Sequence, residues 1–349
     1  MAQPKNHASS SNSGSNSGSN SGSNSGSRSG SGRSEGSRPA FWQDGRTSAQ
    51  SRPAARRAAR NKQGKGGTKA AWFAIGLVVL VIVGLVTVKL IGSGSSTKAA
   101  TPSSLLPPPV SATVAGQVTG VPAATLNTVG IGAGVTPPQR LAGLPSLSKG
   151  GVPRVVYIGA EYCPFCAAER WALVGALSRF GTFTRLGATT SSAVDVYPST
   201  PTLSFYGSTY HSSYLHFSAV EEATNQPVGS SYQPLQTPTA TEQHLLTKLD
   251  APPYVAAANT NAIPFLDLAN RYLQVGASYS PSVLQGHSRS QIAAALSNPA
   301  SPIAQAVDGT ANELTAALCT VTHGQPGSVC TSPSVRAAAS AVATAPKVG

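Results

Sequence analysis

Charged side chains are scarce in this chain, and acidic ones are scarcest. Asp and Glu number 12 among 349 residues, against 25 Lys and Arg. Charged residues make up 11% of the chain, whereas Gly contributes 35 residues and Pro 27. The length leaves room for two domains, but this composition indicates that much of the chain is not globular.

The positive charge is concentrated at one end, which bears on nucleic acid as a partner. Residues 1–69 hold 12 Lys or Arg and two acidic residues, whereas residues 70–349 hold 13 and 10. No aromatic residue interleaves with the basic cluster at 52–69, as one often would in a nucleic-acid-binding stretch. The cluster therefore predicts a membrane topology signal that touches anionic lipid, and no nucleic acid partner.

Charge is absent altogether from residues 70–88. These 19 residues would span about 28 Å as a helix, close to the thickness of a bilayer core. We expect a single transmembrane helix at 70–91, with the N-terminus cytoplasmic and the C-terminal domain extracytoplasmic at the cell membrane, because the basic flank precedes it. A cleaved signal peptide is the alternative, but its n-region would be some 69 residues long, and no convincing small-x-small cleavage site follows.

Composition then divides the chain into segments. A Ser-Asn-Ser-Gly repeat has almost no apolar side chains to bury, so the basic cytoplasmic tail should be disordered. A stretch rich in Pro, Ala and Ser indicates an extracytoplasmic linker. The expected segments are the tail 1–69, the membrane helix 70–91, the linker 92–150, the folded domain 151–331 and a disordered tail 332–349.

Cysteines are few and all lie on the exported side: Cys163, Cys166, Cys319 and Cys330. An even number in an oxidising compartment favours two disulfides. Adjacency favours Cys163 with Cys166 and Cys319 with Cys330 among the three possible pairings. We interpret Cys319–Cys330 as a structural bridge, and a relay that exchanges electrons with the first pair is the alternative.

The folded domain begins with a strand, a helix and a strand. Residues 152–159 form an apolar run, and 166–180 carry apolar residues at steps of three and four. A second short strand at 182–186 would complete a βαβ unit and a parallel sheet. After an insertion at 188–261, we expect strands at 265–268 and 272–275, and helices that begin at Thr239, Ser288 and Thr310.

The motif Cys163-Pro164-Phe165-Cys166 joins the first strand to its helix. A helix N-terminus stabilises a thiolate on the first cysteine. The spacing of one turn lets the second cysteine attack a mixed disulfide. Pro164 suits the first turn, where its missing N–H costs nothing. This arrangement predicts thiol-disulfide exchange.

Two stretches carry a family resemblance. Residues 159–166 resemble the active-site stretch of thioredoxin-fold proteins, and 263–266 with 272–276 resemble their cis-proline segment and following hairpin. The resemblance implies an α/β, thioredoxin-like fold with a long insertion before the cis-proline strand, preceded by the transmembrane helix and disordered tail. More narrowly, the chain resembles an uncharacterised family of bacterial and archaeal membrane-anchored thioredoxin-like proteins, a domain of unknown function.

The resemblance also implies roles for individual residues. Cys163 would be the catalytic nucleophile and Cys166 the resolving thiol. Pro264 would be the cis-proline, and the backbone of Ile263 would bind a substrate peptide as an added strand.

The sequence departs from the thioredoxin pattern at two positions. Tyr157 stands where thioredoxins have a buried Asp, and Trp171 stands where their helix has a kinking Pro. The missing acid argues against a thioredoxin-like reductant. Glu161 or Glu169 would then accept the proton of Cys166.

These observations predict a membrane-anchored, extracytoplasmic oxidoreductase of the oxidase or isomerase type. Its partners would be exported cysteine-containing proteins and a membrane redox partner, and it needs no cofactor or metal. The alternatives are a non-catalytic envelope binding module, a purely structural disulfide, a zinc site with the second cysteine pair, and a dithiol that delivers copper or haem. The last lacks a histidine cluster, because the histidines are scattered at His211, His216, His244, His287 and His323.

Overall fold

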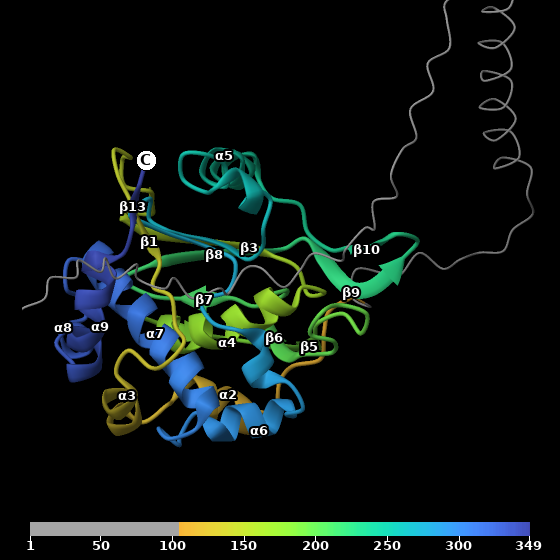
Figure 1. The fold of residues 1–349 in the computed structure, drawn as a ribbon, viewed down its shortest axis with the longest axis horizontal. Coiled ribbons are helices and arrows are strands. Elements are labelled where there is room, and N and C mark those ends of the chain that lie inside the picture. The colour runs from red at the N-terminus through yellow and green to blue at the C-terminus, as the bar shows by residue number, and fades with distance from the viewer. Residues whose placement is uncertain (1–104) are drawn as a thin grey trace, which may run out of the picture. The chain divides into compact units, whose positions relative to one another are not determined.

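The computed structural model describes residues 105–349. Its main sheet has seven strands, six of them in the order β13-β1-β12-β11-β3-β2, while β8 also pairs with β3. Figure 1 shows this sheet between helix α5 and a layer that contains α4, α7, α2 and α6. The strands are β1 (Gln139–Leu141), β2 (Ser148–Lys149), β3 (Val152–Gly159), β8 (His216–Glu221), β11 (Phe265–Leu268), β12 (Tyr272–Val275) and β13 (Lys347–Val348).

Strand β3 is the centre of the fold. It pairs in parallel with β8 along residues 154–159 and antiparallel with β11. Val155 and Tyr157 belong to one core cluster, and Val156 and Ile158 to the other. Because successive side chains of a strand point to opposite faces, this apolar run fills the cores on both sides of the sheet.

Helices cover the two faces unequally. One face packs on α4 (Pro164–Leu177) and α7 (Pro302–Val321), whose small and apolar side chains are almost all buried. The other face packs on α5 (Ala240–Leu249) through Leu245 and Leu249. Helix α5 begins with the predicted capping box of Thr239 and Glu242. The remaining C-terminal elements are η3 (Pro281–Leu284), α6 (Arg289–Ala295) and α8 (Gly327–Cys330).

The stretch 92–150, predicted to be a linker, is folded from residue 105 onwards. It forms α2 (Ala112–Thr119), α3 (Ala123–Val129), β1 and β2. Val114 and Val118, four residues apart on α2, are buried in the core. Gly132 approaches Gly309 of α7 so closely that a Cβ on Gly309 would lie 2.8 Å from the Cα of Gly132. The small residues that suggested a spacer therefore permit close packing.

The C-terminal segment 332–349, predicted to be disordered, is also ordered. It forms α9 (Pro333–Thr344) and then β13, which pairs in parallel with β1. Val335, Ala338 and Val342 are buried. Their spacing of three and four residues places them on one face of the helix. This apolar face is hard to recognise in the sequence, because small Ala residues occur on every side of the helix. The last predicted helix also begins earlier, at Pro302 rather than near Thr310.

The fold class predicted from the sequence, a thioredoxin-like fold behind a transmembrane helix, is wrong as a whole. Within residues 105–349, no helix is both long enough and apolar enough to cross a membrane. The predicted span at 70–91 and the tail 1–69 lie outside the described residues.

The predicted βαβ unit with a parallel sheet is also wrong. Residues 182–183 form β4, which pairs antiparallel with β7 (Tyr210–His211) in a separate small sheet. The parallel neighbour of β3 is β8, which comes from the insertion, and the other neighbours make the sheet mixed. Residues 182–186 lie between Gly181 and Gly187, and neither flank supports a long buried strand.

The insertion 188–261 therefore contributes to the core as well as to the surface. Besides β8, it forms two hairpins and a helix. Its remaining elements, with the strand that leads into it, are β5 (Gly187–Thr190), β6 (Pro201–Ser204), β7, β9 (Ala223–Val228), β10 (Ser231–Pro234), α5 and η2 (Ala257–Asn259).

Candidate functional site

Cys163 and Cys166 lie where β3 ends and α4 begins. Cys163 is the N-cap residue of α4, and its Sγ accepts a hydrogen bond of 3.2 Å from the backbone N–H of Cys166. Pro164 occupies the first turn. Both cysteines are free thiols, so the structure describes the dithiol form rather than the disulfide that adjacency suggested.

The two thiols differ in their electrostatics. Burial raises the pKa of Cys163, but hydrogen bonds from Cys166, the positive charge of Arg170 and the N–H of Phe165 outweigh it, so the pKa lies below its ordinary value. Burial and the neighbouring Cys163 raise the pKa of Cys166 well above its ordinary value. Cys163 is 5% exposed and Cys166 is fully buried. Both thiols are buried, but one is poised to ionise while the other keeps its proton.

The Ile263–Pro264 segment, which precedes β11, also borders the dithiol. The Ile263–Pro264 peptide bond is cis, and the Sγ of Cys163 lies 3.6 Å from the carbonyl oxygen of Ile263. Pro264 is buried and Ile263 is half-buried. Residues a hundred positions apart in sequence thus lie in contact at the thiol.

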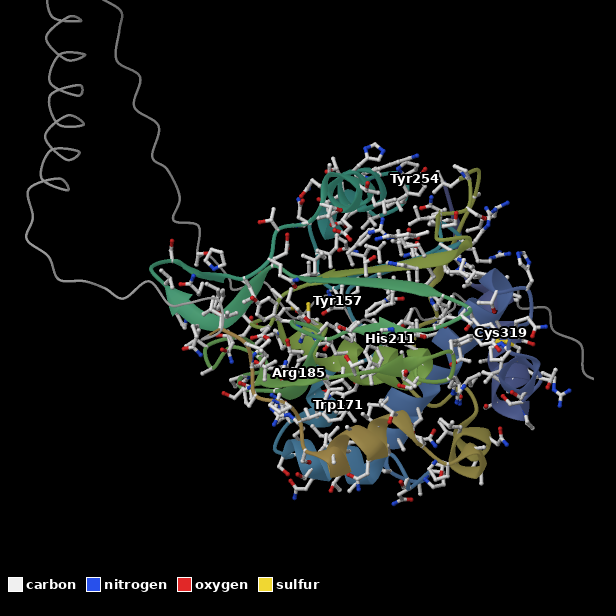
Figure 2. All side chains as sticks on the ribbon, turned by 180° about the vertical axis from the view of Figure 1, so that it is seen from behind. Tyr157, Trp171, Arg185, His211, Tyr254 and Cys319 are labelled. Atoms are coloured by element: carbon white, nitrogen blue, oxygen red, sulfur yellow. A yellow bond between two sulfur atoms is a disulfide. The ribbon has the colours of Figure 1, made fainter. Side chains whose placement is uncertain are left out.

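Tyr157 of β3, labelled in Figure 2, lies close to the dithiol. A Cβ on Gly159 would lie 2.4 Å from the Tyr157 hydroxyl and 3.0 Å from the Sγ of Cys166, so both atoms fill the space that this glycine leaves. The hydroxyl is buried and has no hydrogen-bond partner among the described residues. Burial raises the pKa of Tyr157 well above its ordinary value, so the phenol stays neutral.

A buried ion pair lies next to this tyrosine, and sequence reasoning missed it. Arg170 donates to both carboxylate oxygens of Glu221, at 2.8 and 2.6 Å, and also to the carbonyl of Ala160. Both side chains are fully buried. The available signal was an arginine one turn after Cys166, in a helix that is otherwise apolar apart from Glu169.

The two acids predicted to serve Cys166 are both buried. Glu161 accepts hydrogen bonds from Ser204 at 2.6 Å and Thr189 at 3.3 Å, and burial raises its pKa. Glu169 accepts from the N–H and hydroxyl of Ser278, and burial raises its pKa to about 7. Neither forms a hydrogen bond with a cysteine thiol in this structure; their partners are Ser204, Thr189 and Ser278.

Trp171, which stands where thioredoxins have a proline, secures helix α4. Its side chain is fully buried, and its indole N–H donates to the carbonyl of Pro201 at 3.1 Å. This bond ties α4 to β6 of the neighbouring hairpin. The helix runs without interruption from Pro164 to Leu177.

Aromatic side chains from the insertion lie beside the cysteine motif. Tyr162 stacks on Tyr232 with ring centroids 4.1 Å apart, and Phe165 meets Tyr197 edge to face at 5.8 Å. The insertion also hydrogen-bonds to the motif, because Glu161 donates its N–H to the carbonyl of Ala223. The role of the insertion was left open by the sequence.

The second cysteine pair lies elsewhere. Cys319, near the end of α7, forms a disulfide with Cys330, at the end of α8. Figure 2 shows Cys319 at one side of the molecule, away from Tyr157. Neither sulfur is available to a zinc ion shared with Cys163. Across residues 105–349, no group of three or more His, Cys, Asp or Glu side chains is placed to hold a metal ion.

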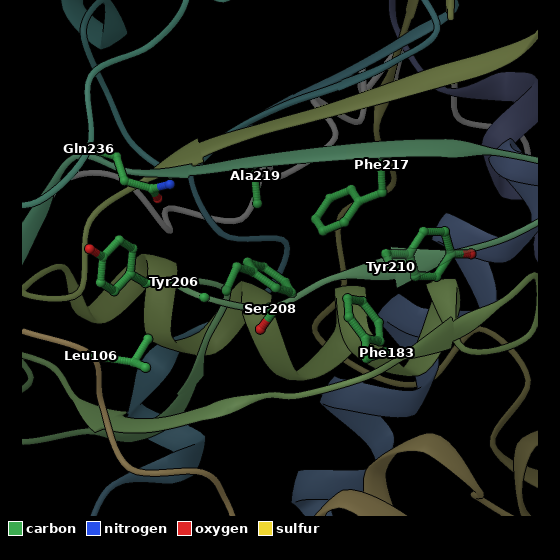
Figure 3. Close-up of a pocket in the computed structure, with 10 residues that line it drawn as sticks. Leu106, Phe183, Tyr206, Ser208, Tyr210, Phe217, Ala219 and Gln236 are labelled. Carbon is green, nitrogen blue, oxygen red and sulfur yellow. The ribbon is translucent and has the colours of Figure 1, made fainter. Parts of the chain in front are cut away.

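A cavity of about 470 Å³ lies between β8 and the segment 205–210, and Figure 3 shows its lining. Phe183, Tyr210 and Phe217 form an aromatic end, and Gln236 and Tyr206 lie towards the other end. Neither cysteine lines it. Its wall residue Phe205 contacts the ring of Tyr157 at 5.1 Å, so the cavity and the dithiol share one layer of side chains.

Comparison with known proteins places the chain in a family without supplying an activity. No curated protein and no solved structure matches the chain. One family model, described as a domain of unknown function, matches residues 144–320, which include β3, α4, the insertion and β11. The match covers half of the chain and both halves of the candidate site, and the chain accordingly belongs to the DUF929 family.

Proposed function

We propose that the protein is a thiol-disulfide oxidoreductase whose reacting pair is Cys163 and Cys166. The observation that carries the proposal is the contrast between the thiols: Cys163 caps a helix and has a lowered pKa, while buried Cys166 has a raised one. A thiolate is the nucleophile in exchange, and the protonated neighbour waits until a mixed disulfide forms.

The reaction from the dithiol form balances without a cofactor. The Cys163 thiolate attacks one sulfur of a substrate disulfide, which releases one substrate thiolate and leaves a mixed disulfide. Cys166 then loses its proton and attacks the Sγ of Cys163, which releases the second substrate thiol. The substrate gains two electrons and two protons, and the protein gains the Cys163–Cys166 disulfide. The oxidase direction is the reverse of these steps.

The oxidase or isomerase type suits this site better than a strong reductant. A lowered pKa on Cys163 stabilises the dithiol form, and a stabilised dithiol raises the reduction potential of the pair. Burial disfavours the thiolate form of Cys166, whereas the positive charge of nearby Arg170 favours it. The neutral phenol of Tyr157 is close enough to Cys166 to interact with that charge as it forms.

Two further parts of the proposal concern kinship and compartment. The cysteine motif after β3 and the Ile263–Pro264 segment beside it support a relationship to thioredoxin-fold proteins. The Cys319–Cys330 disulfide supports an oxidising, extracytoplasmic compartment, where the substrates would be exported proteins that contain cysteine.

The test is disulfide exchange by the full chain and by two variants. Cys163→Ser should abolish turnover of a disulfide-bonded peptide, because it removes the nucleophile. Cys166→Ala should instead accumulate a mixed disulfide between Cys163 and the substrate, visible by mass spectrometry, because the resolving thiol is missing. Turnover that persists in Cys163→Ser would overturn the proposal.

A non-catalytic binding module is the second candidate, since Cys163 is only 5% exposed. In that case the insertion would bind partners and the dithiol would be inert. The same experiment separates the two, because a binding module would show no mixed disulfide in Cys166→Ala.

A further inference from the structure

A short loop of the insertion contacts the cysteine motif at two points. Ser192 donates its N–H to the carbonyl of Tyr162, the residue before Cys163, and Tyr197 packs against Phe165, between the two cysteines. The loop is closed on itself, because Ser199 donates its N–H to the carbonyl of Ser192. Residues 192–197, called the rim loop below, are therefore held at the edge of the dithiol.

The rim loop exposes aliphatic side chains that nothing in its own fold needs. Val194 is 80% exposed and Val196 is 59% exposed. They are two of six large hydrophobic residues that are exposed in the described part of the chain, and only Asp195 separates them in the sequence. Exposed apolar residues gathered at one spot indicate an interaction site more often than single ones do.

Aromatic side chains extend this apolar edge. Tyr232 stacks on Tyr162, and its hydroxyl donates to Ser192 at 2.8 Å, so the stack and the rim loop are joined. Tyr162, Tyr197 and Tyr232 are each half-buried, which leaves part of each side chain open to a ligand. Such rings offer large contact area at low entropic cost.

The charge of the insertion restricts what can bind. Residues 188–247 contain no Lys or Arg. A small acidic disulfide such as glutathione disulfide carries several carboxylates, and residues 188–247, which include the rim loop, offer them no Lys or Arg side chain. The lack of a cation does not weaken the binding of an uncharged or apolar ligand.

Resting on the proposed function, we propose that the rim loop selects extended polypeptides that carry aliphatic or aromatic side chains beside the reacting cysteine. The nucleophile identifies the occupant, because whatever covers the rim must present a sulfur to Cys163, whose Sγ lies against the Ile263 carbonyl. Folded proteins bury such side chains, so the substrates are chains that have not finished folding.

The test compares two disulfide-bonded peptides of equal charge. One has Leu and Phe beside each cysteine, and the other has Ser and Thr there. In single-turnover reactions, the reduced full chain should reduce the apolar peptide with a second-order rate constant about tenfold higher, the scale expected when aliphatic groups find an apolar site. The double variant Val194→Ser, Val196→Ser should react with the two peptides at nearly equal rates. Ile131→Ser, which removes an aliphatic side chain exposed by 48% outside the insertion, is the matched control and should keep the preference.

Two further measurements separate this proposal from the function on which it rests. All three proteins should reduce bis(2-hydroxyethyl) disulfide, a small uncharged probe, at the same rate. If the wild-type chain fails with this probe, the oxidoreductase proposal fails, and fluorescence anisotropy of the two peptides still tests the rim. The rim proposal would be overturned if the wild type reacts with and binds both peptides equally well. It would also be overturned if the double variant keeps the preference for the apolar peptide.

Discussion

The two cysteine pairs of this protein differ in where they stand on their helices. Cys163 caps the start of α4, where a backbone N–H reaches its sulfur, whereas Cys319 lies in the last turn of α7 and is joined to Cys330. Helix N-termini favour negative charge and C-termini disfavour it. The same residue type is therefore prepared to react at one end of a helix and held in a bond at the other.

Removal of the buried cation beside the first pair should have the largest effect. Arg170→Met leaves the Glu221 carboxylate buried without its cation and with the N–H of Phe205 as its remaining donor, and should cost about 3–5 kcal/mol of unfolding free energy. It should also raise the pKa of Cys163, which loses a stabilising charge. Urea denaturation and alkylation rates measure the two effects. The double variant Arg170→Met, Glu221→Leu should recover most of the stability; a single variant as stable as the wild type would contradict the account.

The free energy of unfolding should depend on pH through the buried Glu169 of helix α4. Burial raises the pKa of Glu169 to about 7, whereas an unfolded Glu has a pKa of about 4.3. The folded chain then binds more protons between these values, so this contribution is largest below the unfolded pKa and is lost as the pH rises through 7. The loss should reach ~3 kcal/mol. Glu169→Gln should show a shallower fall in urea stability from pH 4.5 to 8, and an unchanged slope would refute the assignment.

The second pair should matter for stability and not for exchange. Cys319→Ala with Cys330→Ala opens a loop with a sequence separation of 11, which should cost about 2–3 kcal/mol in the chain-entropy model. Peptide exchange by Cys163 should stay at the wild-type rate. A large drop in exchange at temperatures where the variant is folded would instead indicate that the pair is a redox relay.

A methyl group at Gly159 tests the placement of Tyr157 beneath the first pair. Gly159→Ala puts a Cβ 2.4 Å from the Tyr157 hydroxyl, so the side chain must shift, at a cost of about 1–3 kcal/mol. Tyr157→Phe in the same chain should recover part of this. Gly175→Ala on α4 is the control, because its Cβ would meet Ala311 at an ordinary 3.5 Å. In thermal unfolding, the melting temperature of the control should equal that of the wild type.

Local patterns predicted much of the centre of the fold. The apolar run of β3, the helix after the cysteines and the hairpin at β11 and β12 were all visible, because each is marked by its own periodicity and turn residues. The segments 105–150 and 332–349 were not. Their helices use Ala, Val and Gly, whose burial depends on a close approach such as that of Gly132 to Gly309, and no local pattern encodes it.

The site shows the same division. The sequence located Cys163, Cys166 and the Ile263–Pro264 segment, because motif and spacing are local signals. It missed the pairing of Arg170 with Glu221, because that pairing depends on β8 lying beside β3, and the sequence placed another strand there. It missed the rim loop, because that loop joins β5 to β6 in a hairpin that the sequence did not predict. Long-range strand pairing was the missing information.

The most direct test of the central claim is the pKa of each free thiol. The rate of alkylation by iodoacetamide is followed against pH in the reduced full chain, and mass spectrometry assigns the modified residue. The account predicts that Cys163 is modified first, with a pKa below about 8.5, the value of an ordinary cysteine, while Cys166 stays unmodified. Equal reactivity of the two thiols, or a Cys163 pKa at or above that value, would contradict it.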